Sequence, residues 1–325
     1  MTRLLITGAT GFVGRAAVGT FARQGFAVRA AVRRTSEPPL PVGIETVALP
    51  DLSLDFDWRP LLNGVDQVIH LAAIADSAAA PELHDRVNRQ ATEKLALAAA
   101  SSGISRLVFI SSIRAQSRPS ADHALTEADA PTPSDAYGRS KLAAEGAVRA
   151  AGVPFCILRP VLLYGPGVKG NFSFLLRIAR SRWPLPIKDL VNRRSLLGVD
   201  NLVSAIAFAL SAPAAAGETF IVADPGIPPR LAEVIAILRE AQGRRPLILP
   251  LPRPLMEGPM RLLRRDLWER VGGNLRADPG KLLAAGWQPL YDTREGLIEL
   301  IQGARGGAAS RSRNTIPPTT PTPKT

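Results

Sequence analysis

The sequence predicts an α/β fold in which a doubly wound parallel sheet carries helices on both faces and is followed by a smaller mixed α/β lobe. In the first half of the 325 residues, short apolar runs alternate with longer segments of helical periodicity. The apolar runs are continuous rather than alternating, which is typical of strands buried on both faces of a parallel sheet.

The elements of the first half follow in a regular order. We predict strands over residues 3–7, 27–32, 44–49, 65–72, 107–111 and 154–158, and helices over 14–23, 83–101 and 136–150. This alternation of strands and helices favours a single parallel sheet built from strand–helix–strand units.

The sequence changes character after Pro160. Prolines and glycines crowd residues 160–170 and 224–230, and predicted helices at 172–182, 200–211 and 231–242 alternate with short strands such as 219–222. From residue 303 onward, Gly, Ala, Ser, Thr and Pro show no apolar periodicity. We therefore divide the chain into a sheet domain at 1–160, a second lobe at 161–302 and a disordered tail at 303–325.

Composition narrows the class of protein. One cysteine, and three histidines without ligand spacing, argue against a disulfide framework and a dedicated metal site. No apolar stretch approaches the ~18 residues of a membrane span, and the N-terminal apolar run is too short for a signal peptide, so we expect a cytoplasmic protein. The net charge of +12 is spread over arginines scattered among acids, with no interleaved aromatic residues, so we expect no nucleic-acid binding.

Directly after the first strand, the loop Thr7-Gly8-Ala9-Thr10-Gly11-Phe12-Val13-Gly14 has the spacing G-x-x-G-x-x-G. Gly8 permits a sharp turn, Gly11 lets backbone N–H groups approach a pyrophosphate, and Gly14 permits close packing of helix on strand. Because the loop follows a strand and opens a helix, it predicts a Rossmann-type dinucleotide-binding domain; the alternative is an ordinary turn.

The end of the second strand predicts the choice of dinucleotide. An acidic residue there would bind the ribose 2′-hydroxyl of NAD, whereas arginine favours the 2′-phosphate of NADP. The chain has Arg33 and Arg34 and no acid until Glu37, which favours NADP and leaves NAD possible. A solvated basic loop is the alternative. Asp51, beyond the third strand, is a candidate to bind the adenine amine.

Tyr137 and Lys141 lie four residues apart and therefore share one face of a predicted helix. A tyrosine with an ordinary pKa near ~10 is a poor acid–base group at neutral pH. We expect the ammonium group and a nicotinamide cation to lower that pKa. Ser111 and Ser112 close a strand upstream, where a hydroxyl could bind the same substrate oxygen. A surface pair arising by chance is the alternative for Tyr137 and Lys141 alone.

These motifs, with the segments at 70–73 and 159–161, together resemble the extended short-chain dehydrogenases/reductases of the NAD-dependent epimerase/dehydratase family, over about residues 2–302. The resemblance implies a catalytic triad of Ser112, Tyr137 and Lys141, in which Tyr137 exchanges a proton with the substrate oxygen while hydride passes between carbon and nicotinamide. It implies cofactor contacts from Gly8, Thr10, Gly11, Phe12, Val13, Gly14, Arg33, Arg34, Asp51, Leu52, Leu71, Ala72, Ala73, Tyr137, Lys141 and Pro160.

The second lobe is similar to that of bacterial UDP-hexose and UDP-N-acetylhexosamine 4-epimerases and UDP-4-keto-sugar reductases. This similarity implies a UDP-sugar substrate, with Asn171 binding a phosphate and Arg194 clamping the pyrophosphate. The alternatives are a helix cap for Asn171 and a surface salt bridge for Arg194. Ser111 and Asn88 complete the expected substrate site, although helix packing is an equal alternative for Asn88.

The resemblance also narrows the reaction. Dehydratases of the family typically carry an Asp-Glu pair after the catalytic hydroxyl, where this chain has Ile113-Arg114. The two arginines at 33–34 favour an NADPH-dependent reductase of a UDP-4-keto-(6-deoxy)-N-acetylhexosamine. Gln116-Ser117, where epimerases usually have Tyr-Gly, agrees with this choice.

A UDP-glucose or UDP-N-acetylglucosamine 4-epimerase with tightly bound NAD is the alternative. A non-catalytic dinucleotide sensor is disfavoured because the chain keeps its tyrosine and lysine. Family members often pair through the helices near 84–101 and 136–150, so we expect a homodimer.

Overall fold

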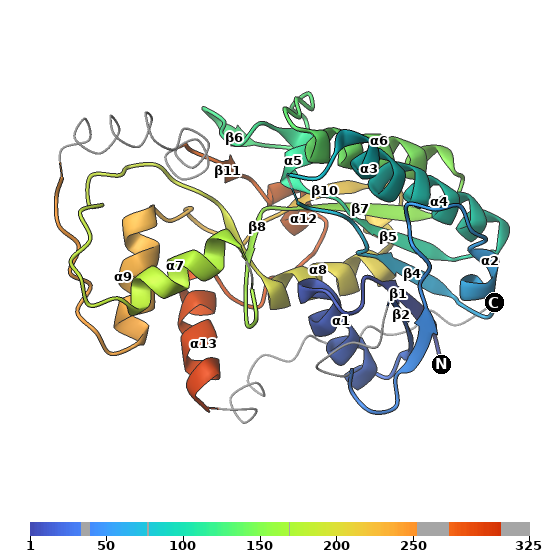
Figure 1. The fold of residues 1–325 in the computed structure, drawn as a ribbon, viewed down its shortest axis with the longest axis horizontal. Coiled ribbons are helices and arrows are strands. Elements are labelled where there is room, and N and C mark those ends of the chain that lie inside the picture. The colour runs from blue at the N-terminus through green and yellow to red at the C-terminus, as the bar shows by residue number, and fades with distance from the viewer. Residues whose placement is uncertain (34–39, 77, 169, 252–272, 307–325) are drawn as a thin grey trace.

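The computed structural model describes residues 1–33, 40–76, 78–168, 170–251 and 273–306 (Figure 1). Its centre is a sheet of seven parallel strands in the order β10-β7-β5-β4-β1-β2-β3. The predicted fold class is confirmed. The bounds are β1 (Arg3–Thr7), β2 (Ala27–Val32), β3 (Glu45–Ala48), β4 (Gln67–His70), β5 (Arg106–Ile110), β7 (Phe155–Pro160) and β10 (Thr219–Val222).

The strand order reverses between β1 and β4, which is where open parallel sheets bind ligands. Thr7 pairs with His70, and His70 pairs with Phe109, so the ends of β1, β4 and β5 lie at one edge of the sheet. The glycine loop and the Ser111-Ser112 pair both begin at this edge.

Helices cover both faces of the sheet (Figure 1). One face packs against α1 (Phe12–Arg23) and α8 (Val199–Ser211), and the other against α4 (Ala91–Ser101) and α6 (Ala136–Ala150). Shorter helices are α2 (Arg59–Leu62), α3 (Pro81–His84) and α5 (Ile113–Gln116). The strands other than the largely exposed edge strand β3 are buried from both sides, which explains their continuous apolar sequence.

The helix predicted over 83–101 is divided into three parts. A π-helical turn at Asp85–Gln90 separates α3 from α4. Such turns are rare and occur often at functional sites. This turn carries Asn88, whose side chain is buried.

The second lobe is built around the helices α7 (Asn171–Arg180), α9 (Leu231–Ala241) and α13 (Thr293–Gly306), which pack together at one end of the molecule (Figure 1). The remaining short elements are β6 (Ala124–Leu125), β8 (Leu162–Tyr164), β9 (Leu196–Gly198), β11 (Arg276–Ala277), α12 (Gly280–Ala284) and the 3₁₀ turn Pro213–Ala215. Strands β8 and β9 form one small parallel pair, and β6 and β11 form another.

Two features of the second half depend on tertiary structure. Strand β10 and helix α8 return to the main sheet, so the boundary expected at residue 160 divides the sequence but not the sheet. The tail predicted from residue 303 lies outside the described residues from 307 onward, and 303–306 belong to α13.

A buried carboxylate joins the elements of the second half. Asp224 accepts hydrogen bonds from Asn201 Nδ2 at 2.7 Å, from the Tyr164 hydroxyl at 2.7 Å, from the Gly198 backbone N–H at 3.0 Å and from the Thr293 hydroxyl at 3.2 Å. These four donors connect β8, β9, α8 and α13 to the end of β10.

In the ranges described above, none of the helices has the length and apolar character that crossing a membrane requires. The same residues contain no cluster of three or more His, Cys, Asp or Glu side chains suited to a metal ion.

Candidate active site

The glycine loop has the close approaches that its spacing predicts. Gly8 has a φ of +67°, and a Cβ atom added there would lie 2.8 Å from the backbone nitrogen of Ala72. A Cβ atom on Gly14 would lie 2.1 Å from the carbonyl oxygen of Gly8. Gly11 begins α1 without a side-chain cap. The N–H groups of the first turn are therefore available to a pyrophosphate, and the loop fits a dinucleotide.

A buried polar chain supports this loop and was not anticipated from the sequence. The Thr7 hydroxyl lies 2.7 Å from Nδ1 of His70, and Nε2 of His70 lies 2.9 Å from the Thr92 hydroxyl. The Thr92 hydroxyl donates to the carbonyl oxygen of Asn88, and Thr7 Oγ1 accepts from the backbone N–H groups of residues 71–72. These contacts assign the proton of the ring to Nε2. Burial lowers the pKa of His70 to about 3, so the ring is neutral.

Near the end of β2, the charge of an arginine acts on an acid. Hydrogen bonds from the backbone and hydroxyl of Ser53 lower the pKa of Asp51, and the charge of Arg33 adds to this effect. Arg33 is exposed, whereas Arg34 lies outside the described residues. Arg33 therefore has an acidic neighbour, which reduces the net positive charge offered to a 2′-phosphate.

Two helix caps bring Ser112 and Tyr137 together. Ser112 caps α5 by accepting the Arg114 N–H at 3.2 Å, and Asp135 caps α6 by accepting the Gly138 N–H at 2.7 Å. A Cβ atom on Gly138 would lie 2.3 Å from the carbonyl oxygen of Arg114, so glycine is required for this approach of α5 and α6. The Ser112 side chain consequently lies close enough to Tyr137 to lower the pKa of the phenol.

The side chains around Tyr137 keep its phenol protonated. Burial raises the pKa of Tyr137, and the charge of Asp135 raises it further. The Ser112 side chain and the charge of Arg114 oppose this effect without reversing it. The protein's own residues therefore raise this pKa, and the lowering expected from the sequence, which included the charge of a nicotinamide cation, stays a prediction. A protonated phenol is the form that can donate a proton to a ketone oxygen.

Lys141 is 2% exposed, and its ammonium nitrogen lies 4.3 Å from the centre of the Phe109 ring. Burial lowers the pKa of Lys141 to about 7, and the charge of Glu145 opposes that effect. Within the described part of the chain, this ammonium group makes no hydrogen bond to another residue. A buried donor of this kind fits the hydroxyl groups of a nicotinamide ribose.

Two predicted substrate residues are occupied by internal contacts. Ser111 donates its hydroxyl proton to Glu145 Oε1 at 2.6 Å. Asn88 donates to the Ile74 carbonyl oxygen at 2.9 Å and to Ser140 Oγ at 3.0 Å, and it accepts the Ile74 N–H at 2.8 Å. The structure therefore favours the helix-packing alternative for Asn88, and it turns the Ser111 hydroxyl toward α6.

Arg194, the predicted pyrophosphate clamp, does not form the surface salt bridge that is its alternative role. Its guanidinium donates at 3.1 Å to the carbonyl oxygens of Gly273 and Pro119, and among the described residues no carboxylate contacts it. Burial, and then the charge of Arg114, lower its pKa to about 10. Its charge is thus available to an anionic ligand. Asn171 is the first residue of α7, but its side chain is not described.

Two residues that lie beside the triad were not predicted as site residues from the sequence. The ring centre of His84 lies 6.0 Å from that of Tyr137, and Asn88 Nδ2 lies 3.3 Å from His84 Nδ1. Glu145 follows Lys141 by one helical turn. The spacing of four residues was visible in both cases, but it does not by itself distinguish a site residue from a packed one.

Comparisons with known proteins agree with this geometry. A family model described as "NAD dependent epimerase/dehydratase family" matches residues 4–223. A UDP-glucose 4-epimerase of Vibrio cholerae is 32% identical over 313 residues, which cover 92% of this chain and 94% of the relative.

Solved structures are similar over nearly the whole length. MoeE5 in complex with UDP-glucose and NAD has a TM-score of 0.72 at 26% identity, covering 93% of this chain and 98% of that one. The UDP-N-acetylglucosamine 4-epimerase of Bacillus cereus has a TM-score of 0.77 at 23% identity, covering 94% and 100%. At that identity, the second similarity shows the fold alone. The chain belongs to the NAD-dependent epimerase/dehydratase family and is a nicotinamide-dinucleotide-dependent enzyme of the extended short-chain dehydrogenase/reductase type.

Proposed function

We propose that this protein transfers hydride at C4 of a UDP-sugar, with Ser112, Tyr137 and Lys141 as its catalytic residues. The observation that carries the proposal is that two helix caps and the close approach at Gly138 bring Ser112 beside Tyr137. Lys141 follows one turn later on the same helix. All three residues lie on segments that meet at the same edge of the sheet as the glycine loop.

Each residue has a distinct part in this chemistry. When bound, the nicotinamide accepts or returns the hydride. Tyr137 as a phenol gives a proton to the C4 oxygen when a ketone is reduced, and as a phenolate it takes the proton of the C4 hydroxyl when an alcohol is oxidised. Ser112 binds the same oxygen and fixes its distance from the phenol. Lys141, buried beside Phe109, would bind the ribose hydroxyls and supply positive charge near the phenol.

The guanidinium of Arg194 can bind the diphosphate of the UDP-sugar. This guanidinium is held by two carbonyl oxygens and meets no carboxylate among the described residues. Guanidinium groups bind diphosphates through two parallel hydrogen bonds. The similarity to MoeE5 in complex with UDP-glucose and NAD supports a UDP-sugar as the ligand.

Of the two reactions compatible with this site, we propose 4-epimerisation with bound NAD first. A UDP-glucose 4-epimerase is similar over 94% of its own length, and the charge of Arg33 acts on Asp51. Reduction of a UDP-4-keto sugar with NADPH is the second candidate. The exposed guanidinium of Arg33 favours it because that group could bind a 2′-phosphate.

Two measurements separate these reactions. Mass spectrometry of the denatured protein identifies any dinucleotide that was bound to it. Proton NMR of the enzyme with UDP-glucose or UDP-N-acetylglucosamine shows whether the C4 epimer appears. Bound NAD⁺ with an accumulating epimer supports the epimerase. Loss of NADPH absorbance only when a UDP-4-keto sugar is added supports the reductase. Failure of both substrates contradicts the proposed function.

A further inference from the structure

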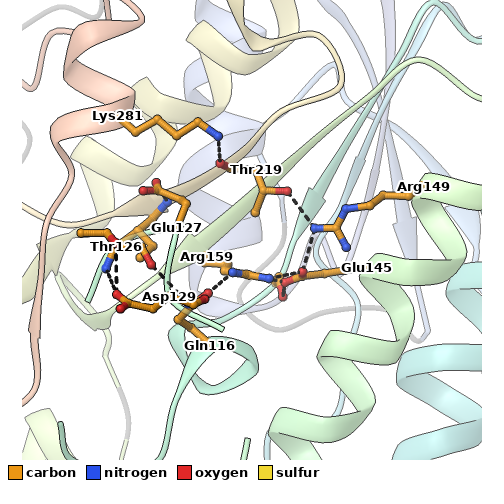
Figure 2. Close-up of polar contacts among 11 residues, drawn as sticks. Gln116, Thr126, Glu127, Asp129, Glu145, Arg149, Arg159, Thr219 and Lys281 are labelled. Atoms are coloured by element: carbon orange, nitrogen blue, oxygen red, sulfur yellow. Dashed lines mark hydrogen bonds and ion pairs between the residues drawn. The ribbon is translucent and has the colours of Figure 1, made fainter. Parts of the chain in front are cut away.

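A carboxylate that is not part of the triad lies directly behind it. Glu145 of α6 is completely buried and accepts four hydrogen bonds. Arg159 donates from Nε at 2.8 Å and from Nη2 at 2.6 Å, Ser111 donates its hydroxyl proton at 2.6 Å, and Arg149 donates at 3.1 Å. Figure 2 shows Glu145 between the two arginines. Four donors occupy both oxygens, which holds the carboxylate in one orientation.

Glu145 is also one helical turn beyond Lys141, so the two side chains lie on the same face of α6. The groups that face Lys141 are the neutral ring of His70 from β4, the Phe109 ring from β5, and Tyr137 and Glu145 of its own helix. Of these, Glu145 carries the negative charge. Its field stabilises the ammonium form of Lys141 against the effect of burial.

The same carboxylate fixes the turn that carries Ser112. Ser111, whose hydroxyl proton it accepts, is the first residue after β5. The next residue, Ser112, caps α5 beside Tyr137 and lowers the pKa of its phenol. A movement of Ser111 would therefore change the distance between the Ser112 hydroxyl and the phenol.

The network continues on the far side of Arg159. Arg159 donates through Nη1 to the side-chain oxygen of Gln116, the last residue of α5. Gln116 in turn donates to the carbonyl oxygens of Thr126 at 3.2 Å and Asp129 at 2.6 Å (Figure 2). Both ends of α5 are thus tied to α6 by polar contacts. Gln116 makes these contacts at the position where the sequence departs from the usual Tyr-Gly of epimerases.

We propose that Glu145 is a positioning residue of the active site, which supplies the negative charge beside Lys141 and holds the Ser111–Ser112 turn at its distance from Tyr137. The proposal rests on the catalytic roles proposed above for Ser112, Tyr137 and Lys141. A buried ion pair is weak evidence for stability, because desolvation offsets much of its attraction. A role in placing neighbouring groups accounts for all four of its contacts.

The first test replaces the charge and keeps the shape, in Glu145→Gln. The chain has six lysines, so ¹³Cε-labelled lysine gives few NMR signals, and Lys141→Met identifies the one from Lys141. In the cofactor-free protein, we expect the pKa of Lys141 to fall by about one unit or more in Glu145→Gln. We also expect kcat to fall by about tenfold to a hundredfold, with a smaller change in KM. The pH profile of kcat should shift in the same direction as the pKa of Lys141.

A matched control separates positioning from general destabilisation. Asp224→Asn also removes a buried carboxylate that accepts four hydrogen bonds, but in the second lobe. It should lower the melting temperature and leave the pKa of Lys141 unchanged. If Glu145→Gln also left that pKa unchanged and lowered kcat no more than Asp224→Asn does, the proposal would be wrong.

Glu145→Gln leaves Arg159 charged and buried, which could cause the variant to misfold. A second variant therefore removes the charge of Arg159 as well. Glu145→Gln with Arg159→Met removes both charges and should restore stability. The lowered pKa of Lys141 and the loss of kcat should persist, and their recovery in this double variant would overturn the proposal. Since the NMR titration needs neither cofactor nor substrate, it tests Glu145 even if the wild-type enzyme acts on no UDP-sugar.

Discussion

At the scale of single residues, Tyr137 is the group on which the proposed chemistry depends. Its phenol is protonated and lies close to Ser112 and to the charges of Arg114 and Asp135. General acid–base groups contribute about 10²–10⁴ in rate. We therefore expect Tyr137→Phe to lower kcat by at least about a hundredfold while dinucleotide binding, measured by fluorescence titration, stays within about twofold. Retained activity would contradict the triad.

Lys141 gives a prediction in which stability and activity change in opposite directions. Its pKa of about 7 in the folded protein lies below its ordinary value of 10.5, so the unfolded chain binds more protons between these pH values. Stability from this group is therefore reduced at neutral pH and recovers as pH rises toward 10.5.

Lys141→Met removes the free-energy cost of burying the ammonium group. We expect it to raise the free energy of unfolding by about 1–3 kcal/mol at pH 7, measured by urea titration, while activity is lost. Lys188→Met, at an exposed lysine, is the matched control and should change neither quantity. Equal or lower stability of Lys141→Met would show that burial of the ammonium group costs little.

At the scale of elements, Gly14 determines how α1 sits on β1. A side-chain carbon there would lie 2.1 Å from the Gly8 carbonyl oxygen, which forces α1 away from the loop. We expect Gly14→Ala to lower the free energy of unfolding by about 1–3 kcal/mol and to weaken dinucleotide binding at least tenfold.

Gly19 of the same helix supplies the control for Gly14. Its added carbon would lie 3.3 Å from the flexible end of Arg23. Gly19→Ala should therefore keep binding unchanged and change stability by less than about 1 kcal/mol. If both variants bound the dinucleotide equally well, the close approach at Gly14 would not control the loop.

The chain Thr7–His70–Thr92 connects β1, β4 and α4, and it predicts sensitivity to acid. The folded pKa of His70, about 3, lies below its ordinary value of 6.5. The unfolded state therefore binds the proton first as pH falls, so this contribution is complete above pH 6.5 and is lost progressively toward pH 3.

Between pH 6.5 and 5, we expect His70 to account for a loss of about 2 kcal/mol in the free energy of unfolding, measured by urea titration at both pH values. The variant His70→Asn should be less stable at pH 7 but should lack that part of the pH dependence. An identical slope in both proteins would assign the acid sensitivity to other groups.

At the scale of the whole molecule, we expect a homodimer through α4 and α6. These helices cover one face of the sheet, and Leu97 of α4 is 53% exposed. Leu97→Arg should convert the dimer to a monomer in size-exclusion chromatography with light scattering. Leu54→Arg, at a leucine that is 68% exposed outside these helices, should leave the mass unchanged. A monomeric wild-type protein would contradict this expectation.

The sequence alone was sufficient for the parts of the fold that depend on local pattern. Continuous apolar runs predicted the strands of the sheet, because both of its faces are covered. The spacing of Gly8, Gly11 and Gly14 predicted a loop whose close approaches the structure contains. The spacing of Tyr137 and Lys141 placed both on one face of α6. These features follow from backbone geometry over a few residues.

Only the tertiary structure decided how distant segments share their charges and hydrogen bonds. It placed β10, from the second half, at the edge of the main sheet. It also directed the Ser111 hydroxyl to Glu145, although the sequence predicted that this hydroxyl binds substrate. It also raised the pKa of Tyr137, where the sequence predicted a lowered one. The physical reason is that pairing and desolvation depend on which segments surround a group, and residues such as Glu145 and Arg159 meet only after the chain has folded.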